Sequence, residues 1–368
     1  PPPPRPANTT VDAPRLQRED TMNSPLNPRV VTLGTAGGPM WWAGEGAGRR
    51  SGIATAVLVG DRSYLVDCGH GVGRQLMLAG VPIPSIRGIF ITHLHSDHTI
   101  DLGSLAIFGL YDLAPGDKIT LMGPGDRGVL PRLSPRAAAT PEPIFPANPT
   151  PGTAAMLDSI LQAYATDLND RIFDTLRPSP YEFFEARDIV IPDGIGFHPN
   201  TNPTPDMEPF EIYRDELVTV TATLVAHAPT APAFAFRFDT AEGSVTISGD
   251  TGPCGNLVRL ARETDLLLHE AIDHEWVHRD RPGVPADSAR AAIDHHLHAH
   301  TGVLDCARIA TEAGARALAL HHLVPGTSPG SVWEAGREHF QGDYFVPEDL
   351  DVISFARSRD GAVAASRS

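Results

Sequence analysis

Lysine and cysteine are scarce in this chain. Lys118 is the only lysine among 368 residues, so arginine carries nearly all of the positive charge. The three cysteines are Cys68, Cys254 and Cys306; they form no C-x-x-C pair, and their odd number argues against a disulfide framework. We expect them to be small buried apolar residues, and they do not indicate a cellular compartment.

Long apolar runs are also absent. No segment reaches the roughly 18 apolar residues of a transmembrane helix, and the 41% hydrophobic and 20% charged content is typical of a soluble globular protein. The chain begins with four prolines instead of methionine, and it contains no recognisable signal peptide. The expected localisation is therefore soluble, either cytoplasmic or exported with the signal already removed.

Basic residues are outnumbered by acidic ones, 29 against 45, which gives a net charge of −16. A field of this sign repels polyanions and favours solubility. A nucleotide-binding motif and a serine hydrolase motif are missing as well. GEGAG (44–48) lacks the Lys-Ser/Thr of a P-loop, and no G-x-S-x-G is present, so a serine hydrolase has no support.

The apolar pattern alternates between strand-like and helix-like segments. Runs rich in Val, Ile, Leu, Phe and Thr predict strands at 30–33, 53–59, 64–66, 89–92, 119–122, 218–225, 234–238, 245–248, 266–268 and 318–320. Helical stretches follow several of them, at 73–79, 102–110, 256–263, 303–313 and 331–340. This alternation predicts a layered α/β architecture.

Two parts of the chain depart from this alternation. Residues 1–28 are rich in Pro, Asn, Arg and Asp without apolar periodicity, and we expect a disordered or loosely packed tail. Residues 131–210 are Pro-rich, with one clear helical stretch at 154–176. They are interpreted as an insertion in a hydrolase domain spanning 29–368, and long insertions of this kind often act as lids or binding loops.

The segment GIFITHLHSDHTIDL (88–102) carries the strongest chemical signal. The expected strand 89–92 runs directly into His93, His95, Asp97 and His98. Imidazole and carboxylate are the usual ligands of zinc and similar ions. Residues 93 and 95 share one side of an extended segment, while 97 and 98 lie past a turn, so two adjacent ions can each receive two ligands. A solvated His-rich turn is disfavoured because the motif follows a buried strand.

Further ligand candidates lie at the ends of apolar strands, where α/β sheets build their sites. His227 ends VTVTATLVAH (218–227), Asp250 ends SVTISGD (244–250), and ALALHH (317–322) ends in two histidines. Asp250 can bridge two ions because a carboxylate has two oxygens. Spacing alone does not choose between His321 and His322.

These motifs together resemble the metallo-β-lactamase superfamily, and within it the branch that contains ribonuclease Z and arylsulfatase-like hydrolases. The resemblance spans about residues 30–325 and is weak over 131–210. It is carried by the H-x-H-x-D-H motif and by LGTAGGP (33–39), YLVDCGHG (64–71), SGDT (248–251), LLLHEA (266–271) and residues 300–325. It implies a four-layer αββα sandwich with metals in a groove at its edge.

The resemblance also implies how two ions would share their ligands. One ion would be held by His93, His95 and His227. The other would be held by Asp97, His98 and His322, with Asp250 shared between them. Two divalent ions are expected, zinc first, with manganese or iron(II) as alternatives.

Other polar and aromatic residues near these motifs have two interpretations each. Family members place a histidine like His300 beside the leaving group or developing oxyanion, and a structural hydrogen bond is the alternative. Asp67 is expected to orient a metal-bound imidazole. Trp41 and Trp42 either stack on a flat or apolar substrate or pack near the first strand. Further histidines are expected at the rim of the site or on an exposed helix face: His295, His296, His298, His274 and His278.

The expected chemistry is hydrolysis by a hydroxide of lowered pKa shared by two ions, with Asp97 accepting or orienting the proton. The main interpretation is a small-molecule hydrolase acting on a carboxylic ester, lactone, sulfate ester or phosphodiester. The alternatives are a tRNA 3′-end endonuclease and a non-catalytic or redox module. Nucleic acid is disfavoured because its binding requires several Lys and Arg, whereas residues 131–210 contain no Lys and more acidic than basic residues. No membrane partner is expected, and a homodimer is possible.

Overall fold

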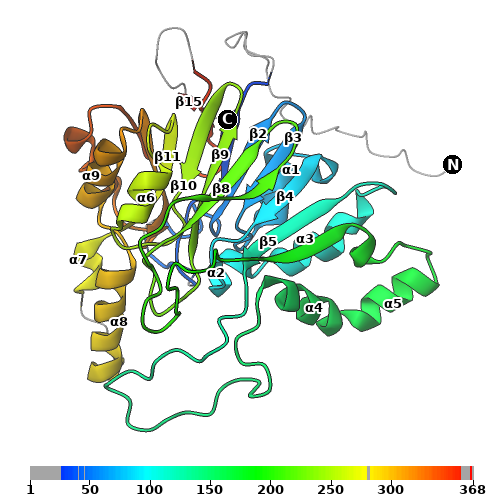
Figure 1. The fold of residues 1–368 in the computed structure, drawn as a ribbon, viewed down its shortest axis with the longest axis horizontal. Coiled ribbons are helices and arrows are strands. Elements are labelled where there is room, and N and C mark those ends of the chain that lie inside the picture. Colours follow the sequence, from blue (N-terminus) through cyan, green and yellow to red (C-terminus); the bar gives the residue numbers. More distant parts are fainter. Residues whose placement is uncertain (1–25, 40, 45, 280–281, 358–364, 367–368) are drawn as a thin grey trace, which may run out of the picture.

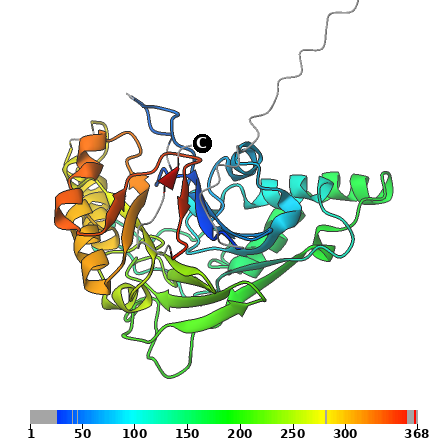
Figure 2. The same cartoon turned by 90° about the horizontal axis from the view of Figure 1, so that it is seen from above.

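Two mixed β-sheets packed face to face form the frame of the molecule, with helices on both outer sides (Figures 1 and 2). The computed structural model describes residues 26–39, 41–44, 46–279, 282–357 and 365–366. This is the αββα sandwich that the resemblance implied. The expected N-terminal tail lies outside the described residues, apart from 26–28.

The first sheet contains eight strands in the order β15-β14-β1-β2-β3-β4-β5-β6. Their bounds are β1 Arg29–Gly34, β2 Ala54–Val59, β3 Arg62–Val66, β4 Ile86–Phe90, β5 Ile119–Pro124, β6 Phe184–Ile189, β14 Val352–Ser354 and β15 Ala365–Ser366. Neighbours are antiparallel from β15 to β3 and parallel from β3 to β6. Parallel neighbours require crossovers, so helices lie along the outer face of this half of the sheet.

The second sheet contains seven strands in the order β13-β12-β11-β10-β9-β8-β7. Their bounds are β7 Phe210–Arg214, β8 Thr219–Leu224, β9 Phe234–Thr240, β10 Gly243–Ile247, β11 Leu266–Ile272, β12 Ala317–Val324 and β13 Asp343–Phe345. Neighbours are antiparallel from β7 to β10 and parallel from β10 to β13. Both sheets therefore have a parallel half in which strands end beside one another.

Helices cover the two outer faces. The N-terminal half contributes α1 Val72–Leu78, α2 Ser96–Thr99, α3 Leu102–Phe108, α4 Thr153–Ala163 and α5 Ala165–Phe173. The C-terminal half contributes α6 Gly255–Leu260, α7 His274–Val277, α8 Ala286–Ala299, α9 Val303–Ala313 and α10 Gly330–Glu334. Among the described helices, none has both the length and the apolar character needed to cross a bilayer.

The core between the sheets is strongly aromatic. Phe90 of the first sheet and Phe236 and Phe238 of the second are fully buried. The rings of Phe90 and Phe238 meet edge to face with centroids 5.4 Å apart, a favoured arrangement for aromatic pairs. Of the three free cysteines, Cys68 and Cys306 are buried as expected, and Cys254 is half-buried.

The segment 131–210 divides into parts with different roles in the fold. Residues 125–152 contain no helix or strand and run below α4 towards α8 (Figure 1), where Arg136 pairs with Asp294 at 2.8 Å. The single helix expected at 154–176 is two helices, α4 and α5, and α4 packs Leu157 and Leu161 into the core outside the first sheet.

β6, which follows these helices, extends the first sheet as a parallel neighbour of β5. Its sequence FEARDI lies at the edge of the sheet, is buried only at its first and last residues and contains three charged residues, so it lacks the apolar run that predicts a strand. The role of the whole segment in substrate choice stays a prediction.

Candidate metal centre

The H-x-H-x-D-H motif follows the C-terminal end of β4. His93 and His95 lie in the connection after the strand, and Asp97 and His98 lie in the first turn of α2. His93 and His98 are 0% and 1% exposed, so their side chains point into the molecule. The local chain therefore has the strand–turn–helix geometry that the motif predicts.

The remaining ligand candidates come from the second sheet. His227 follows β8, and Asp250 follows β10. His322 lies within β12 at a break in the ladder, where Glu270 pairs with His321 but Ala271 pairs with Leu323. His322 is thus the extra residue of a bulge, a feature that redirects side chains near active sites, and its φ of 46° lies in the left-handed region.

The seven candidates form two clusters that share Asp250. Within each cluster the potential ligand atoms lie within 4.8 Å of one another. The first contains His93, His95, His227 and Asp250. The second contains Asp97, His98, His322 and Asp250. His321, the alternative left open by spacing, lies in neither cluster.

Asp250 faces both clusters with different oxygens. Its Oδ2 lies 3.8 Å from His93 Nε2 and 3.9 Å from His227 Nε2. Its Oδ1 lies 3.4 Å from His98 Nε2 and 3.2 Å from His322 Nε2. A carboxylate in this position is arranged to bridge two cations.

Buried polar atoms in the clusters fit metal ions. Among the described residues, His93 Nε2 and Asp250 Oδ1 are buried without a hydrogen-bond partner, and such atoms cost about 1–3 kcal/mol unless they are satisfied. Burial lowers the pKa of His93 and of His227 well below the ordinary value. Both imidazoles are therefore neutral, the form that binds metal.

His98 shows the opposite shift. Burial disfavours its charged form, but Asp250, Asp67 and Asp97 outweigh burial and raise the pKa of His98 well above the ordinary value. In the metal-free protein, a proton on His98 thus balances part of the surplus negative charge. The donor set fits zinc and other divalent ions that accept nitrogen and oxygen ligands.

Neighbouring groups orient the ligand imidazoles. His98 Nδ1 donates to Asp67 Oδ2 at 2.8 Å, and His227 Nδ1 donates to the Ala299 carbonyl at 2.8 Å. Both bonds leave Nε2 for an ion, as outer partners of metal-bound histidines do. Asp67 is thus in contact with a candidate ligand, as its expected role requires, and that role stays a prediction. Thr230, whose Oγ1 lies 2.6 Å from His95 Nε2, has no sequence motif that predicts it.

His300 lies beside both clusters and is held by Glu270. His300 Nδ1 is 3.3 Å from Glu270 Oε2 and 3.9 Å from Asp250 Oδ2. Glu270 Oε1 accepts hydrogen bonds from the backbone of Thr251 and Thr301. Burial opposes charge on His300, but Glu270 and Asp250 outweigh it and raise the pKa of His300 to about 9.

Sequence reasoning missed Glu270, although it stands in LLLHEA beside His269 at the end of a buried strand. His269 itself donates from Nδ1 to the Glu270 carbonyl at 2.7 Å and lies in neither cluster. The further histidines, which were expected at the rim of the site or on an exposed helix face, lie near the surface. His274, His278 and His298 are exposed, and His295 and His296 are half-buried on α8.

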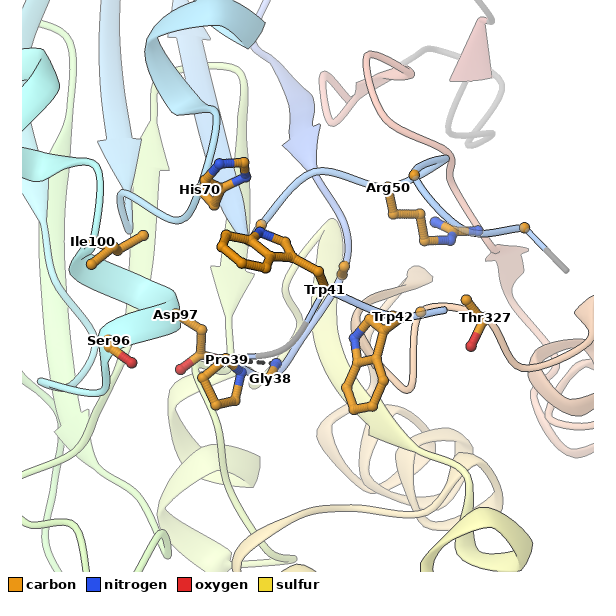
Figure 3. Close-up of a pocket in the computed structure, with 15 residues that line it drawn as sticks. Gly38, Pro39, Trp41, Trp42, Arg50, His70, Ser96, Asp97, Ile100 and Thr327 are labelled. Carbon is orange, nitrogen blue, oxygen red and sulfur yellow. Dashed lines mark hydrogen bonds between the residues drawn. The ribbon is translucent and has the colours of Figure 1, made fainter. Parts of the chain in front are cut away.

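A cavity of about 330 Å³ opens next to the second cluster, with Asp97 on its wall. Figure 3 shows Trp41 and Trp42 on one side and Ile100 and Asp97 on the other, with His70 beside Trp41. Trp42 is fixed by its Nε1–H bond to the Gly37 carbonyl at 2.9 Å, whereas Trp41 is 87% exposed. The cavity is mostly apolar around a charged end.

Asp97 connects the cavity to the metal ligands. Its Oδ2 accepts from the Gly38 backbone at 2.9 Å and lies 3.3 Å from His322 Nε2. Burial opposes ionisation, but His98 and His322 outweigh it and hold the pKa of Asp97 well below its ordinary value. Asp97 is therefore an ionised acceptor at the boundary between ligands and cavity.

Sequence comparison identifies relatives over most of the chain. It is 31% identical over 309 residues to ribonuclease Z of Mycolicibacterium gilvum (strain PYR-GCK), covering 82% of this chain and 89% of the relative. It is 30% identical over 289 residues to ribonuclease Z of Mycobacterium sp. (strain KMS), covering 77% and 81%. The family model described as anti-Pycsar protein Apyc1 matches residues 53–126.

Solved structures share the fold at lower identity. Human tRNase Z, short form, aligns with a TM-score of 0.56 and 21% identity, covering 89% of this chain and 99% of that chain. The metallo-β-lactamase fold protein YhfI from Bacillus subtilis aligns with a TM-score of 0.53 and 19% identity, covering 88% and 98%.

The sandwich and its His/Asp clusters define a metal-dependent hydrolase, and the two clusters are consistent with a binuclear site. The chain belongs to the metallo-β-lactamase superfamily and is related within it to ribonuclease Z. The ribonuclease Z part of the expected resemblance is confirmed. The arylsulfatase part finds no support among these relatives.

Proposed function

We propose that this chain hydrolyses phosphodiester bonds at a dinuclear centre. The observation that carries the proposal is the position of Asp250, whose two oxygens face separate ligand clusters. The proposed ligands are His93, His95, His227, Asp97, His98, His322 and the shared Asp250. Zinc is the ion that we expect first, with manganese and iron(II) as alternatives.

The ions, when bound, supply positive charge that activates water near neutral pH and stabilises charge developing on the attacked group. Asp97 is placed to accept a hydrogen bond from the attacking water and to orient it, because it is ionised and borders both the ligands and the cavity. His300, kept protonated by Glu270, is placed to donate a proton to the leaving oxygen. One oxygen–phosphorus bond forms and one breaks, with no covalent bond to the protein.

The bond type is inferred from the relatives. Ribonuclease Z, by its name, acts on RNA, and two such relatives match about four fifths of this chain at 30–31% identity. This supports the tRNA-processing alternative better than the expected small-molecule ester, lactone or sulfate substrate. Cleavage at the 3′ end of a precursor tRNA is therefore the second function that we propose to test.

Charge sets a limit on how such an RNA would bind. Net charge is −16 and Lys118 is the only lysine, so few phosphates outside the metal centre would be neutralised. The affinity for RNA should then fall only shallowly with salt, because the slope follows the number of phosphates neutralised. A steep salt dependence would mean that arginines form a basic surface stronger than the composition suggests.

A substrate panel tests the proposal. Zinc-loaded protein is assayed with bis(p-nitrophenyl) phosphate, p-nitrophenyl acetate, p-nitrophenyl sulfate and a precursor tRNA that carries a 3′ trailer. We expect the phosphodiesters to be cleaved at least 100 times faster than the ester and sulfate. Faster cleavage of the sulfate or the carboxylic ester would refute the proposal. Cleavage of bis(p-nitrophenyl) phosphate but not of precursor tRNA would support phosphodiester hydrolysis and exclude precursor tRNA as the substrate.

A further inference from the structure

Three histidines outside the proposed dinuclear ligand set converge at the end of α8. His295 and His296 belong to the last turns of the helix, and His300 follows its final residue, Ala299. One potential ligand nitrogen of each lies within 4.8 Å of the others. The ring centroids form a nearly equilateral triangle with sides of 5.5, 5.8 and 5.8 Å.

Neighbouring groups hold two of these rings in place. His300 Nδ1 is engaged by the Glu270 carboxylate, an arrangement that leaves the other ring nitrogen for a metal ion. The ring of His296 packs against Trp276, with centroids 5.5 Å apart. His295 completes the triangle on the side that faces His227, at a centroid distance of 5.9 Å.

We propose that His295, His296 and His300 form a third divalent metal site, separate from the dinuclear centre. Three imidazoles suit zinc and its borderline neighbours, with water in the fourth position. Calcium and magnesium are excluded because they require oxygen ligands. The site contains no carboxylate ligand and the dinuclear clusters contain one or two each, so the third ion binds more weakly than the first two.

The third site connects to the dinuclear centre through His300. The His300 ring lies 5.1 Å from the His227 ring and 6.1 Å from the His322 ring, measured between centroids. An ion on His300 prevents this residue from donating a proton to a leaving group. Excess zinc should therefore inhibit the enzyme. This inhibition rests on the proposed function, whereas the binding of a third ion does not.

Metal stoichiometry gives the decisive test. Metal-free protein is dialysed against increasing zinc, and bound zinc is measured by elemental analysis. The wild type should bind two ions tightly and a third more weakly. His296→Ala should retain the two tight ions and raise the dissociation constant of the third at least tenfold. Retention of the tight pair shows that the variant is folded.

The matched control is His298→Ala, which removes a histidine two residues further along the same helix. His298 is exposed, and its Nδ1 donates to the Asp294 carbonyl, so this variant should still bind three ions. Saturation of the wild type at two ions would overturn the proposal. Equal binding of a third ion by both variants would also overturn it, because the third ion would then lie elsewhere.

Activity supplies a second readout. Excess zinc should inhibit the wild type and His298→Ala relative to their own uninhibited rates, and it should inhibit His296→Ala at least tenfold less strongly. Equal inhibition of all three proteins would show that zinc at this site does not cause the inhibition. If no phosphodiester is cleaved by any of them, the proposed function fails while the stoichiometry still decides the third site.

Discussion

Removal of the Asp250 carboxylate is the sharpest test of the dinuclear assignment. Asp250→Ala takes away the group whose oxygens lie 3.2–3.9 Å from nitrogens of four proposed ligand imidazoles. Two unit charges 4 Å apart interact by about 4 kcal/mol at an effective dielectric constant of 20. Since about 1.4 kcal/mol is a factor of ten, each ion should bind at least roughly a thousandfold more weakly.

The assay combines metal analysis with turnover of bis(p-nitrophenyl) phosphate. Asp250→Ala should retain at most one tightly bound ion and lose activity by a factor of about a thousand or more. The matched control is His274→Ala, because His274 is exposed on α7 and belongs to neither cluster. If the two variants bound equal amounts of metal and turned over substrate equally fast, the ligand assignment would be wrong.

Three further substitutions test separate parts of the site. Glu270→Gln removes the charge that raises the pKa of His300. The alkaline limb of the kcat/KM–pH profile, where His300 loses its proton, should therefore move to lower pH. An unmoved limb would exclude His300 as the general acid. Trp41→Ala should raise KM about 2- to 10-fold, the size of an aromatic contact, with Tm nearly unchanged because Trp41 is exposed; a large fall in Tm would point to packing instead. Asp67→Asn should weaken zinc binding about 10- to 100-fold, measured by competition with a chromophoric chelator, and unchanged affinity would contradict its orienting role.

Sequence reasoning succeeded where the chemistry is local in the chain. The motif from His93 to His98 follows a buried strand, and backbone geometry over six residues is enough to assign two of its side chains to each of the two clusters that the structure shows. His227 and Asp250 were also within reach, since each ends or follows an apolar strand and the carboxyl ends of such strands gather at one edge.

The choice of His322 over His321 needed information that spacing does not contain. Strand alternation puts adjacent residues on opposite faces, and the bulge in β12 changes this register at His322. Its φ of 46° is unfavourable for a residue with a side chain. The ladder on both sides of the bulge holds this conformation, and single-sequence periodicity does not report it.

Glu270 and the triangle on α8 were missed for a different reason. Glu270 contacts His300, which lies 30 residues further along the chain, so their contact depends on how β11 and the end of α8 pack. The strand β6 was also missed because it depends on a contact distant in the sequence. It pairs with β5 and has no apolar run of its own.

Charge balance connects metal loading to substrate binding. Four carboxylates converge on the centre through direct contacts with its histidines, namely Asp67, Asp97, Asp250 and Glu270. Without metal they add to a net charge of −16 and repel an anionic phosphodiester. Two divalent ions would bring four positive charges, which offset these four carboxylates, and protonated His300 would offset the hydroxide expected between the ions. The metal-loaded centre would thus be close to neutral, and it would repel a phosphodiester far less than the metal-free centre does. Such a centre favours a substrate that presents one phosphodiester at the cavity over one that lays a long phosphate backbone across the surface.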